Sequence, residues 1–188
     1  TKAATMYAAW DQLPELTIVD LDRPGKEQFL TKSHRDGFEK LIKIKPEMFN
    51  FRNRHGQTVH GFKLTPPGFQ KTDKRPLMVY VYGGPLGRGR TIVDGAFGST
   101  EVMFANYMAY AMGYVCIAVD PRGQSGYGAA FGKANYNQAG KAQVEDLVDA
   151  VNHMKSEGGI DPARVGVNGW SFGGFQTQMC LFTAPETF

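Results

Sequence analysis

The segment Gly169-Trp170-Ser171-Phe172-Gly173-Gly174 contains the side chain best placed to act as a nucleophile. It matches the pattern G-x-S-x-G, in which a serine lies on a sharp, strained strand-to-helix turn. An apolar run at 164–167 precedes it and a helix-compatible run at 175–182 follows it, as such a turn requires. We therefore predict that Ser171 attacks a carbonyl carbon, and that the backbone N–H of Phe172, at a helix start, stabilises the oxyanion. The alternative is a glycine-rich turn that binds nothing.

A second glycine-rich segment, residues 123–128, offers a competing serine. The spacing of the residues after Ser125 breaks the nucleophile pattern. The run Gly126-x-Gly128-x-x-x-Gly132 loosely matches a dinucleotide-binding loop, but its spacing differs by one residue. In addition, no acidic residue follows at the end of a neighbouring strand. We interpret this segment as a tight loop and predict no nucleotide site.

The elements around these segments indicate an α/β fold. Continuous apolar runs at 77–82, 114–119 and 164–167 are typical of strands in a parallel sheet covered on both faces. Apolar residues at 144–154 recur at spacings of three and four, which predicts a helix, and 102–112 is a weaker helix candidate. Strands and helices that alternate in this way predict an α/β domain with a mostly parallel sheet.

The N-terminal third of the chain is different, because short β-branched runs alternate there with turn residues. Strands are expected at 16–21 and 27–31, and a third strand is expected at 5–10. A further pair is expected at 48–52 and 57–64. A β-meander of this kind occurs as a propeller blade, but one blade is not a repeat, so this pattern leaves the architecture open.

Composition argues against several classes of protein. The 188 residues carry 21 Lys and Arg against 18 Asp and Glu, and a charge of +3 is too small to predict a nucleic-acid partner. The longest apolar run is six residues, too short for a transmembrane helix. Cys116 and Cys180 lie in apolar segments typical of buried thiols. Cysteine and histidine do not cluster, so we predict no metal and no cofactor.

Three segments together resemble the prolyl oligopeptidase family of serine peptidases. They are Tyr80-Val81-Tyr82-Gly83-Gly84-Pro85, the run D-P-R-G-Q-S-G-Y-G at 120–128, and the serine segment at 169–174, in the family's order. The tryptophan before the serine favours the dipeptidyl peptidase IV branch, including prolyl tripeptidyl peptidases, over the acylaminoacyl peptidase and prolyl oligopeptidase branches. The resemblance covers about residues 10–188 and implies an α/β-hydrolase domain preceded by a β-propeller.

The resemblance also implies a domain order. Residues 1–37 would be the last strands of the propeller, 38–65 would be linker strands, and 66–188 would be the N-terminal part of the hydrolase domain. A boundary is accordingly expected near residue 65. The native N-terminus is expected to be absent, and the compartment is left open between cytoplasmic and periplasmic or secreted.

By position in that family, Ser171 corresponds to the nucleophile, and the oxyanion hole would receive the Phe172 N–H and the Tyr82 hydroxyl. Arg122 is expected to hold its loop, and Trp170 to pack near the serine. The family's triad order is Ser, then Asp or Glu, then His. No Asp or His follows the serine, and all four histidines precede it: His34, His55, His60 and His153. We expect the triad Asp and His to lie outside this chain, which would then be a fragment, inactive and poorly stable alone.

The whole protein is therefore predicted to be a serine exopeptidase that releases N-terminal di- or tripeptides, with a preference for cleavage after proline as one reading. Its partner would be a peptide substrate, and a homo-oligomer is expected. Two alternatives stay open. One is an acylaminoacyl peptidase or esterase on the same fold, and the other is a non-catalytic homologue that binds its ligand without cleaving it.

Overall fold

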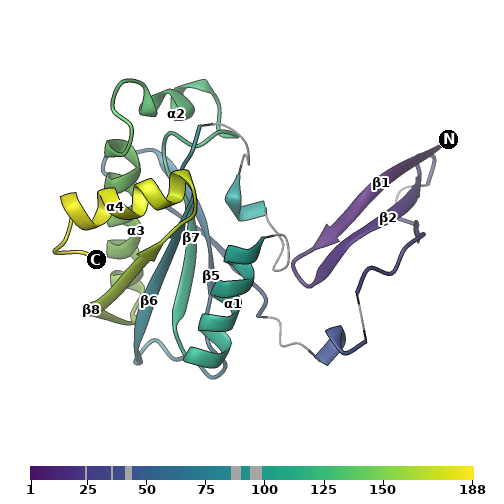
Figure 1. Ribbon diagram of the computed structural model, residues 1–188, viewed down its shortest axis with the longest axis horizontal. Helices are drawn as coiled ribbons and strands as arrows, with labels where there is room; N and C mark the ends of the chain where they lie inside the picture. The colour runs from purple at the N-terminus through teal and green to yellow at the C-terminus, as the bar shows by residue number, and fades with distance from the viewer. Residues whose placement is uncertain (24, 35, 41–43, 86–89, 94–98) are drawn as a thin grey trace.

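The computed structural model describes residues 1–188 except 24, 35, 41–43, 86–89 and 94–98 (Figure 1). Within this part the strands form two sheets, one of three strands and one of five. Figure 1 shows the strand pair β1–β2 set apart from the body that contains the helices α1 to α4. All strands of the first sheet precede residue 30, and the second sheet and the helices α1 to α4 follow.

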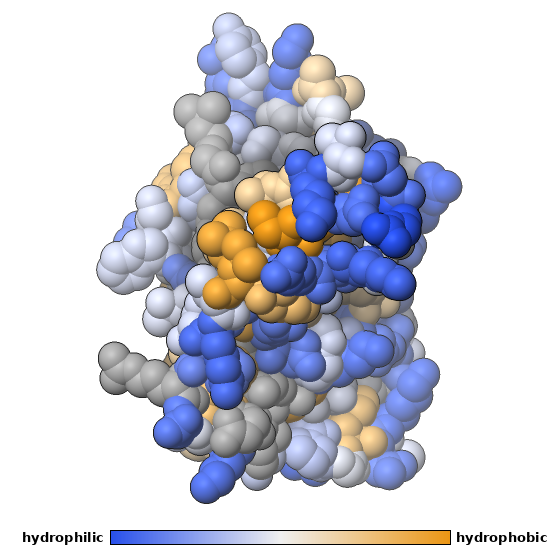
Figure 2. All heavy atoms as spheres, turned by 90° about the vertical axis from the view of Figure 1, so that its right-hand side faces the viewer, coloured by the Kyte–Doolittle hydropathy of each residue, from blue (hydrophilic) through white to orange (hydrophobic). Residues whose placement is uncertain are grey.

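The N-terminal sheet is antiparallel, with the order β1(Lys2–Ala9), β2(Gln12–Asp20), β3(Glu27–Phe29). Glu15 of the central strand β2 is buried and accepts hydrogen bonds from Thr31 Oγ1 and Ser33 N. Figure 2 views the molecule from the right-hand side of Figure 1, where β1 and β2 lie, and shows an apolar patch among hydrophilic side chains. The exposed apolar residues of this region include Met6, Leu16, Leu21, Phe29 and Leu30. Met6 and Leu16 are cross-strand neighbours on one face of the sheet, whereas Phe29 pairs with Thr17 and lies on the other face.

The second sheet has the strand order β4-β5-β7-β6-β8. Its strands are β4(Glu47–Arg52), β5(Thr58–Leu64), β6(Lys74–Val81), β7(Val115–Asp120) and β8(Gly159–Asn168). β6 pairs in parallel with β7 and with β8, whereas β5 pairs antiparallel with both β4 and β7. Every strand except β5 therefore runs in one direction, and the expectation of a mostly parallel sheet is confirmed.

β4 and β5 form the strand pair that the sequence predicted at 48–52 and 57–64, within the segment 38–65 expected to be linker strands. β5 is hydrogen-bonded to β7 from the pair His60–Asp120 to the pair Leu64–Cys116, so it is an interior strand of the sheet. Its side chains enter both cores, with Val59 in one and Phe62 and Leu64 in the other, although the sequence TVHGFKL is less apolar than the parallel strands are. The sheet thus begins before residue 65. The separate status of 1–37 and 66–188 as domains stays a prediction.

Helices cover both faces of this sheet. Leu77, Val79 and Val81 of β6 pack in one core with α3(Lys141–Glu157) and α4(Phe172–Thr183), while Met78 and Tyr80 pack in a second core with α1(Thr100–Met112). Alternate residues of one strand thus enter opposite cores, as the period of two requires. The remaining helical elements are η1(Phe38–Lys40), η2(Thr91–Val93), α2(Ala129–Gly132) and η3(Lys133–Asn135).

The helix ends follow from local sequence. Ser99 caps α1, since its Oγ accepts a hydrogen bond from Val102 N at 3.2 Å, and Gly113 ends the helix with φ 73°. Glycines also flank α3, with φ 98° at Gly140 and φ 85° at Gly158. None of the helices in the described part of the chain has the length and apolar character needed to cross a membrane.

Candidate active site

Ser171 lies in the turn between β8 and α4, at the carboxyl edge of the sheet. Its backbone angles are φ 55° and ψ −117°, a left-handed region that costs free energy for any residue with a Cβ atom. The side chain is exposed, and no capping hydrogen bond from the hydroxyl to the helix is formed. A strained, exposed serine at a helix start is the geometry that the G-x-S-x-G pattern predicted.

The two glycines of the pattern allow α4 to approach the end of β6. A Cβ atom on Gly169 would lie 2.4 Å from Val81 O, and a Cβ atom on Gly173 would lie 2.1 Å from the same oxygen. Either distance is far below contact, so larger residues would push the helix away from the strand. The glycines therefore set the distance between Ser171 and the residues that follow β6.

Tyr82 follows β6 directly and lies beside the serine turn. The position of a Gly173 Cβ would be 3.2 Å from Tyr82 Cα, and the Tyr82 and Phe172 ring centroids are 6.4 Å apart. A pocket of about 360 Å³ is lined by Tyr82 and Trp170 together with Ser99, Thr100 and Glu101. The structure thus brings together the three residues assigned to the site from the sequence. Their catalytic roles remain predictions.

Trp170 differs from the expectation that it packs near the serine. Its side chain is 75% exposed and lines the mouth of the pocket. The reason is that Gly169 and Gly173 fill the contact with β6, which leaves no room there for an indole. Trp170 also lines a second pocket of about 520 Å³ with Thr100, Glu101, Phe104, Asn168 and Gly169. The indole is therefore available to contact a substrate.

Arg122 holds its loop through a buried ion pair, as expected. Its Nε lies 2.9 Å from Asp146 Oδ1, and its backbone N–H donates to Asp146 Oδ2 at 2.7 Å. Asn53 Nδ2 donates to the same carboxylate at 2.8 Å, which ties the β4–β5 turn to α3. Burial raises the pKa of Asp146 above its ordinary value, although both neighbours favour the ionised form. This cluster supports the loop after β7 and leaves Arg122 only 7% exposed.

The four histidines have partners away from the serine turn. His55 pairs with Glu145, His60 stacks on Tyr127, and His34 stacks on Phe38. His153 stacks against Phe49 and Phe51, at ring-centroid distances of 5.8 and 5.5 Å. No hydrogen bond or ring contact in the described part of the chain joins a histidine to Ser171.

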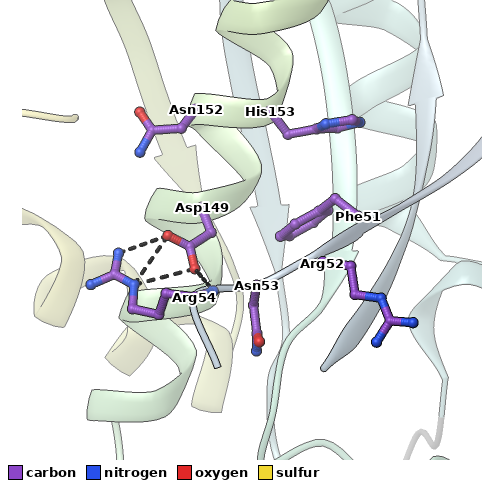
Figure 3. A pocket seen from close by; sticks show the side chains of 7 residues that line it. All are labelled: Phe51, Arg52, Asn53, Arg54, Asp149, Asn152 and His153. Carbon is purple, nitrogen blue, oxygen red and sulfur yellow. Dashed lines mark hydrogen bonds and ion pairs between the residues drawn. The ribbon is translucent and has the colours of Figure 1, made fainter. Parts of the chain in front are cut away.

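A groove of about 450 Å³ lies beside His153, between the end of β4 and helix α3 (Figure 3). Arg54 closes one end of it by a two-pronged contact with Asp149, with N–O distances of 2.8 and 3.1 Å. That pair neutralises both charges, and the stacked imidazole of His153 forms part of the wall. We interpret the groove as a structural contact between the β4–β5 hairpin and α3.

The cysteines are buried, as the sequence predicted. Cys116 lies in β7 and Cys180 lies in α4, with 1% and 0% of their surfaces exposed. Burial raises the pKa of each thiol to about 12, because the apolar surroundings disfavour the thiolate. Both thiols are thus shielded and disfavoured as thiolates, whereas Ser171 is exposed.

Two buried glutamines beside the site were missed from the sequence. Gln124 and Gln143 are fully buried, and both hydrogen-bond to Gly83, the residue after Tyr82. Gln124 follows Gly123 in the segment D-P-R-G-Q-S-G. A glutamine in this glycine-rich loop, which follows a buried strand, was the signal in the sequence that could have indicated its role. Gln143 lies on an apolar helix face, where a polar residue needs a partner when buried.

Comparison with known proteins decides the family. Residues 100–188, from α1 through the serine turn to the last residue, match the sequence model of the prolyl oligopeptidase family. The chain belongs to the prolyl oligopeptidase family. Ser171 and Phe172 lie within the matched residues, whereas Tyr82 precedes them.

Relatives in this family include enzymes named as dipeptidyl peptidases. Dipeptidyl peptidase 8 from Mus musculus is 31% identical over 144 residues, which is 76% of this chain and 16% of that protein. A probable dipeptidyl-aminopeptidase B from Ajellomyces capsulatus (strain NAm1 / WU24) is 29% identical over 83% of this chain and 16% of its own length. The chain thus spans about a sixth of the length of these prolyl oligopeptidase family members.

Solved structures of the same family share the fold. A putative dipeptidyl aminopeptidase IV from Bacteroides ovatus matches all of this chain and 27% of its own, with a TM-score of 0.81 at 28% identity. Acylaminoacyl peptidase from Pyrococcus horikoshii matches 96% of this chain and 27% of its own, with a TM-score of 0.77 at 25% identity. The expected fold class is confirmed: an α/β-hydrolase sheet preceded by terminal strands of a β-propeller.

Proposed function

We propose that this chain is the nucleophile-bearing part of a serine exopeptidase, and that the whole protein releases N-terminal di- or tripeptides. The observation that carries the proposal is the backbone of Ser171, held at φ 55° on an exposed turn whose glycines lie against β6. Strain of this kind persists where the surrounding structure imposes it, which is characteristic of functional turns. The relatives named dipeptidyl peptidase and dipeptidyl-aminopeptidase support the substrate class.

In the proposed reaction the hydroxyl oxygen of Ser171 attacks the scissile carbonyl carbon, and the hydroxyl proton passes to a general base. Negative charge develops on the carbonyl oxygen, where the Phe172 N–H and the Tyr82 hydroxyl would donate hydrogen bonds. Collapse expels the amine, which takes a proton from the protonated base, and leaves an ester on Ser171. Water then attacks this ester and gives a proton to the same base, which returns it to the Ser171 oxygen as the di- or tripeptide leaves with a free carboxyl group.

The general base is proposed to be a histidine outside these 188 residues, oriented by an acidic residue that is also outside them. The four histidines of this chain have contacts elsewhere, with residues such as Glu145, Tyr127 and Phe51. In α/β-hydrolases the acid and the histidine follow the serine in sequence. We also propose that the enzyme prefers to cleave after proline.

A fluorophosphonate probe on the full-length protein tests this proposal, because it reacts covalently with an activated serine. We expect labelling of the wild-type protein, loss of labelling in Ser171→Ala, and retained labelling in Ser125→Ala, the matched control from the other glycine-rich loop. Labelling that survives Ser171→Ala would contradict the assignment. A folded wild-type protein that does not label at all would favour the non-catalytic binding homologue.

A substrate panel tests the specificity. Dipeptide amides with a free N-terminus should be cleaved faster than their N-acetylated forms and than simple esters. The likeness to the acylaminoacyl peptidase of Pyrococcus horikoshii makes the second candidate concrete. A preference for N-acetylated peptides would support that candidate, and hydrolysis of esters alone would support an esterase.

A further inference from the structure

Gly83, the residue that follows Tyr82, is held at both its backbone N–H and its backbone C=O by buried amide side chains. Gly83 N donates a hydrogen bond to Gln124 Oε1 at 3.2 Å, and Gln143 Nε2 donates to Gly83 O at 3.2 Å. Both glutamines have 0% of their surface exposed. They come from different elements, since Gln124 lies in the loop after β7 and Gln143 lies in the first turn of α3. One residue of backbone is thus clamped between two elements.

The orientation of the Gln124 amide follows from its other partners. Its Nε2 donates to Asp120 Oδ1 at 2.8 Å and to Thr91 Oγ1 at 2.9 Å. An ionised carboxylate only accepts hydrogen bonds, so the amide nitrogen must face Asp120 and the amide oxygen must face Gly83 N. Asp120 is itself buried and accepts a hydrogen bond from Tyr127 at 2.7 Å. The acceptor presented to Gly83 is therefore fixed.

The Gln143 amide is oriented in the same way. Its Oε1 accepts a hydrogen bond from Gly140 N at 3.2 Å, and its Nε2 donates to Asn135 Oδ1 at 2.7 Å. The nitrogen thus has one remaining direction, toward Gly83 O. The side chain also lies close to the backbone it holds, because a Cβ atom on Gly83 would be 3.3 Å from Gln143 Cγ.

The clamped residue sets the direction of Tyr82. Gly83 has φ 68°, a left-handed conformation that turns the chain sharply after the strand. The Tyr82 ring lies over Gly84, since a Cβ atom on Gly84 would be 2.7 Å from Tyr82 Cε1. A change in the Gly83 peptide would therefore move the backbone on which the ring rests. Geometry at a reacting centre is sensitive to shifts of about 1 Å.

We propose that Gln124 and Gln143 are positioning residues for catalysis. By holding the backbone N–H and C=O of Gly83, they keep the Tyr82 hydroxyl aimed at the developing oxyanion. This inference rests on the proposed function, in which Tyr82 is an oxyanion donor. Neither glutamine touches substrate. Their effect on turnover passes entirely through Tyr82.

The test is a double-mutant cycle in the full-length enzyme with Gln124→Met, Gln143→Met and Tyr82→Phe. Methionine keeps the volume of glutamine and removes its hydrogen bonds. We expect each methionine variant to lower kcat about 10- to 100-fold, the range for a misplaced catalytic group, with little change in KM. In the Tyr82→Phe background the same substitutions should change kcat by less than about twofold, because the hydroxyl they position is already absent.

Gln176→Met is the matched control. Gln176 is also fully buried and lies in α4, but its amide has no hydrogen-bond partner in the described part of the chain. Its replacement should leave kcat within about twofold of wild type. Should Gln143→Met not fold, Gln143→Glu is the second variant. It keeps an acceptor for Gly140 N, but a carboxylate oxygen, which cannot donate to Gly83 O, takes the place of the amide nitrogen.

Three outcomes would overturn the inference. These are full additivity of the glutamine and Tyr82 effects, a loss confined to KM, and an unchanged kcat in the glutamine variants. All three leave the proposed function standing if Tyr82→Phe itself lowers kcat and Ser171→Ala abolishes labelling. If labelling survives Ser171→Ala, the proposed function fails, and the positioning role fails with it.

Discussion

The carbonyl oxygen of Val81 lies 2.1 Å from the position that a Cβ atom on Gly173 would occupy. Gly173→Ala must therefore separate α4 from β6 or distort the serine turn. We expect this variant to lose about 1–3 kcal/mol of stability, the usual cost of overpacking, and to label poorly with fluorophosphonate. Chemical denaturation and labelling of the full-length protein measure both effects.

Gly166→Ala is the control for that variant, because nothing lies within 4 Å of the added Cβ atom there. It belongs to the strand that leads into the turn, β8, so both substitutions change the same supersecondary unit. Normal stability and labelling are expected. An equal loss in both variants would contradict the importance of the close contact between Gly173 and Val81.

Removal of the Tyr82 hydroxyl should slow turnover. Tyr82→Phe keeps the ring that lies near Phe172 and removes one proposed oxyanion donor. We expect kcat to fall about 10²- to 10³-fold with KM nearly unchanged. Steady-state kinetics on a dipeptide amide measure this, with Tyr136→Phe as the control, since Tyr136 is 76% exposed. A rise in KM at constant kcat would instead make Tyr82 a ground-state contact.

The ion pair between Arg122 and Asp146 should matter more for stability than a surface pair does. In Asp146→Asn the buried Arg122 guanidinium keeps its contact with Glu145 but loses the fully buried carboxylate, and we expect a loss of about 1.5–3 kcal/mol. Asp161→Asn removes a pair with Arg164, whose side chain is 56% exposed, and should leave the unfolding midpoint nearly unchanged. Similar unfolding midpoints for the two variants would refute the distinction.

Glu145 should make stability depend on pH in the acid range. Burial opposes its ionisation, but hydrogen bonds from Arg122 and His55 hold its pKa below the ordinary value of 4.5. A lowered folded pKa contributes stability above the ordinary value that disappears as pH falls through the folded value. Glu145→Gln should therefore be less stable than wild type near pH 7, by about 1 kcal/mol or less, with the difference shrinking below about pH 4. Denaturation curves at several pH values test this, and a difference that grows in acid would reverse the assigned sign.

Much of the fold could be predicted from sequence because its signals are local. The apolar runs that became β6, β7 and β8 reflect burial of a strand on both faces, and this requirement is written in consecutive residues. The turn at Ser171 is equally local, since a strand, a G-x-S-x-G pattern and a helix follow one another within about twenty residues. The nucleophile candidate and the α/β class therefore needed no tertiary information.

Strand order and side-chain contacts across the sheet were decided by tertiary structure. β5 was predicted as a strand, but nothing near it in sequence reveals that it pairs with β7, more than fifty residues later. Exposure of Trp170 likewise depended on which residues of the turn contact β6. The clamp on Gly83 joins it to Gln124 and Gln143, which are brought together only when β6, β7 and α3 pack. Such contacts depend on the packing of distant segments, and for that reason only the folded chain shows how Tyr82 is held beside Ser171.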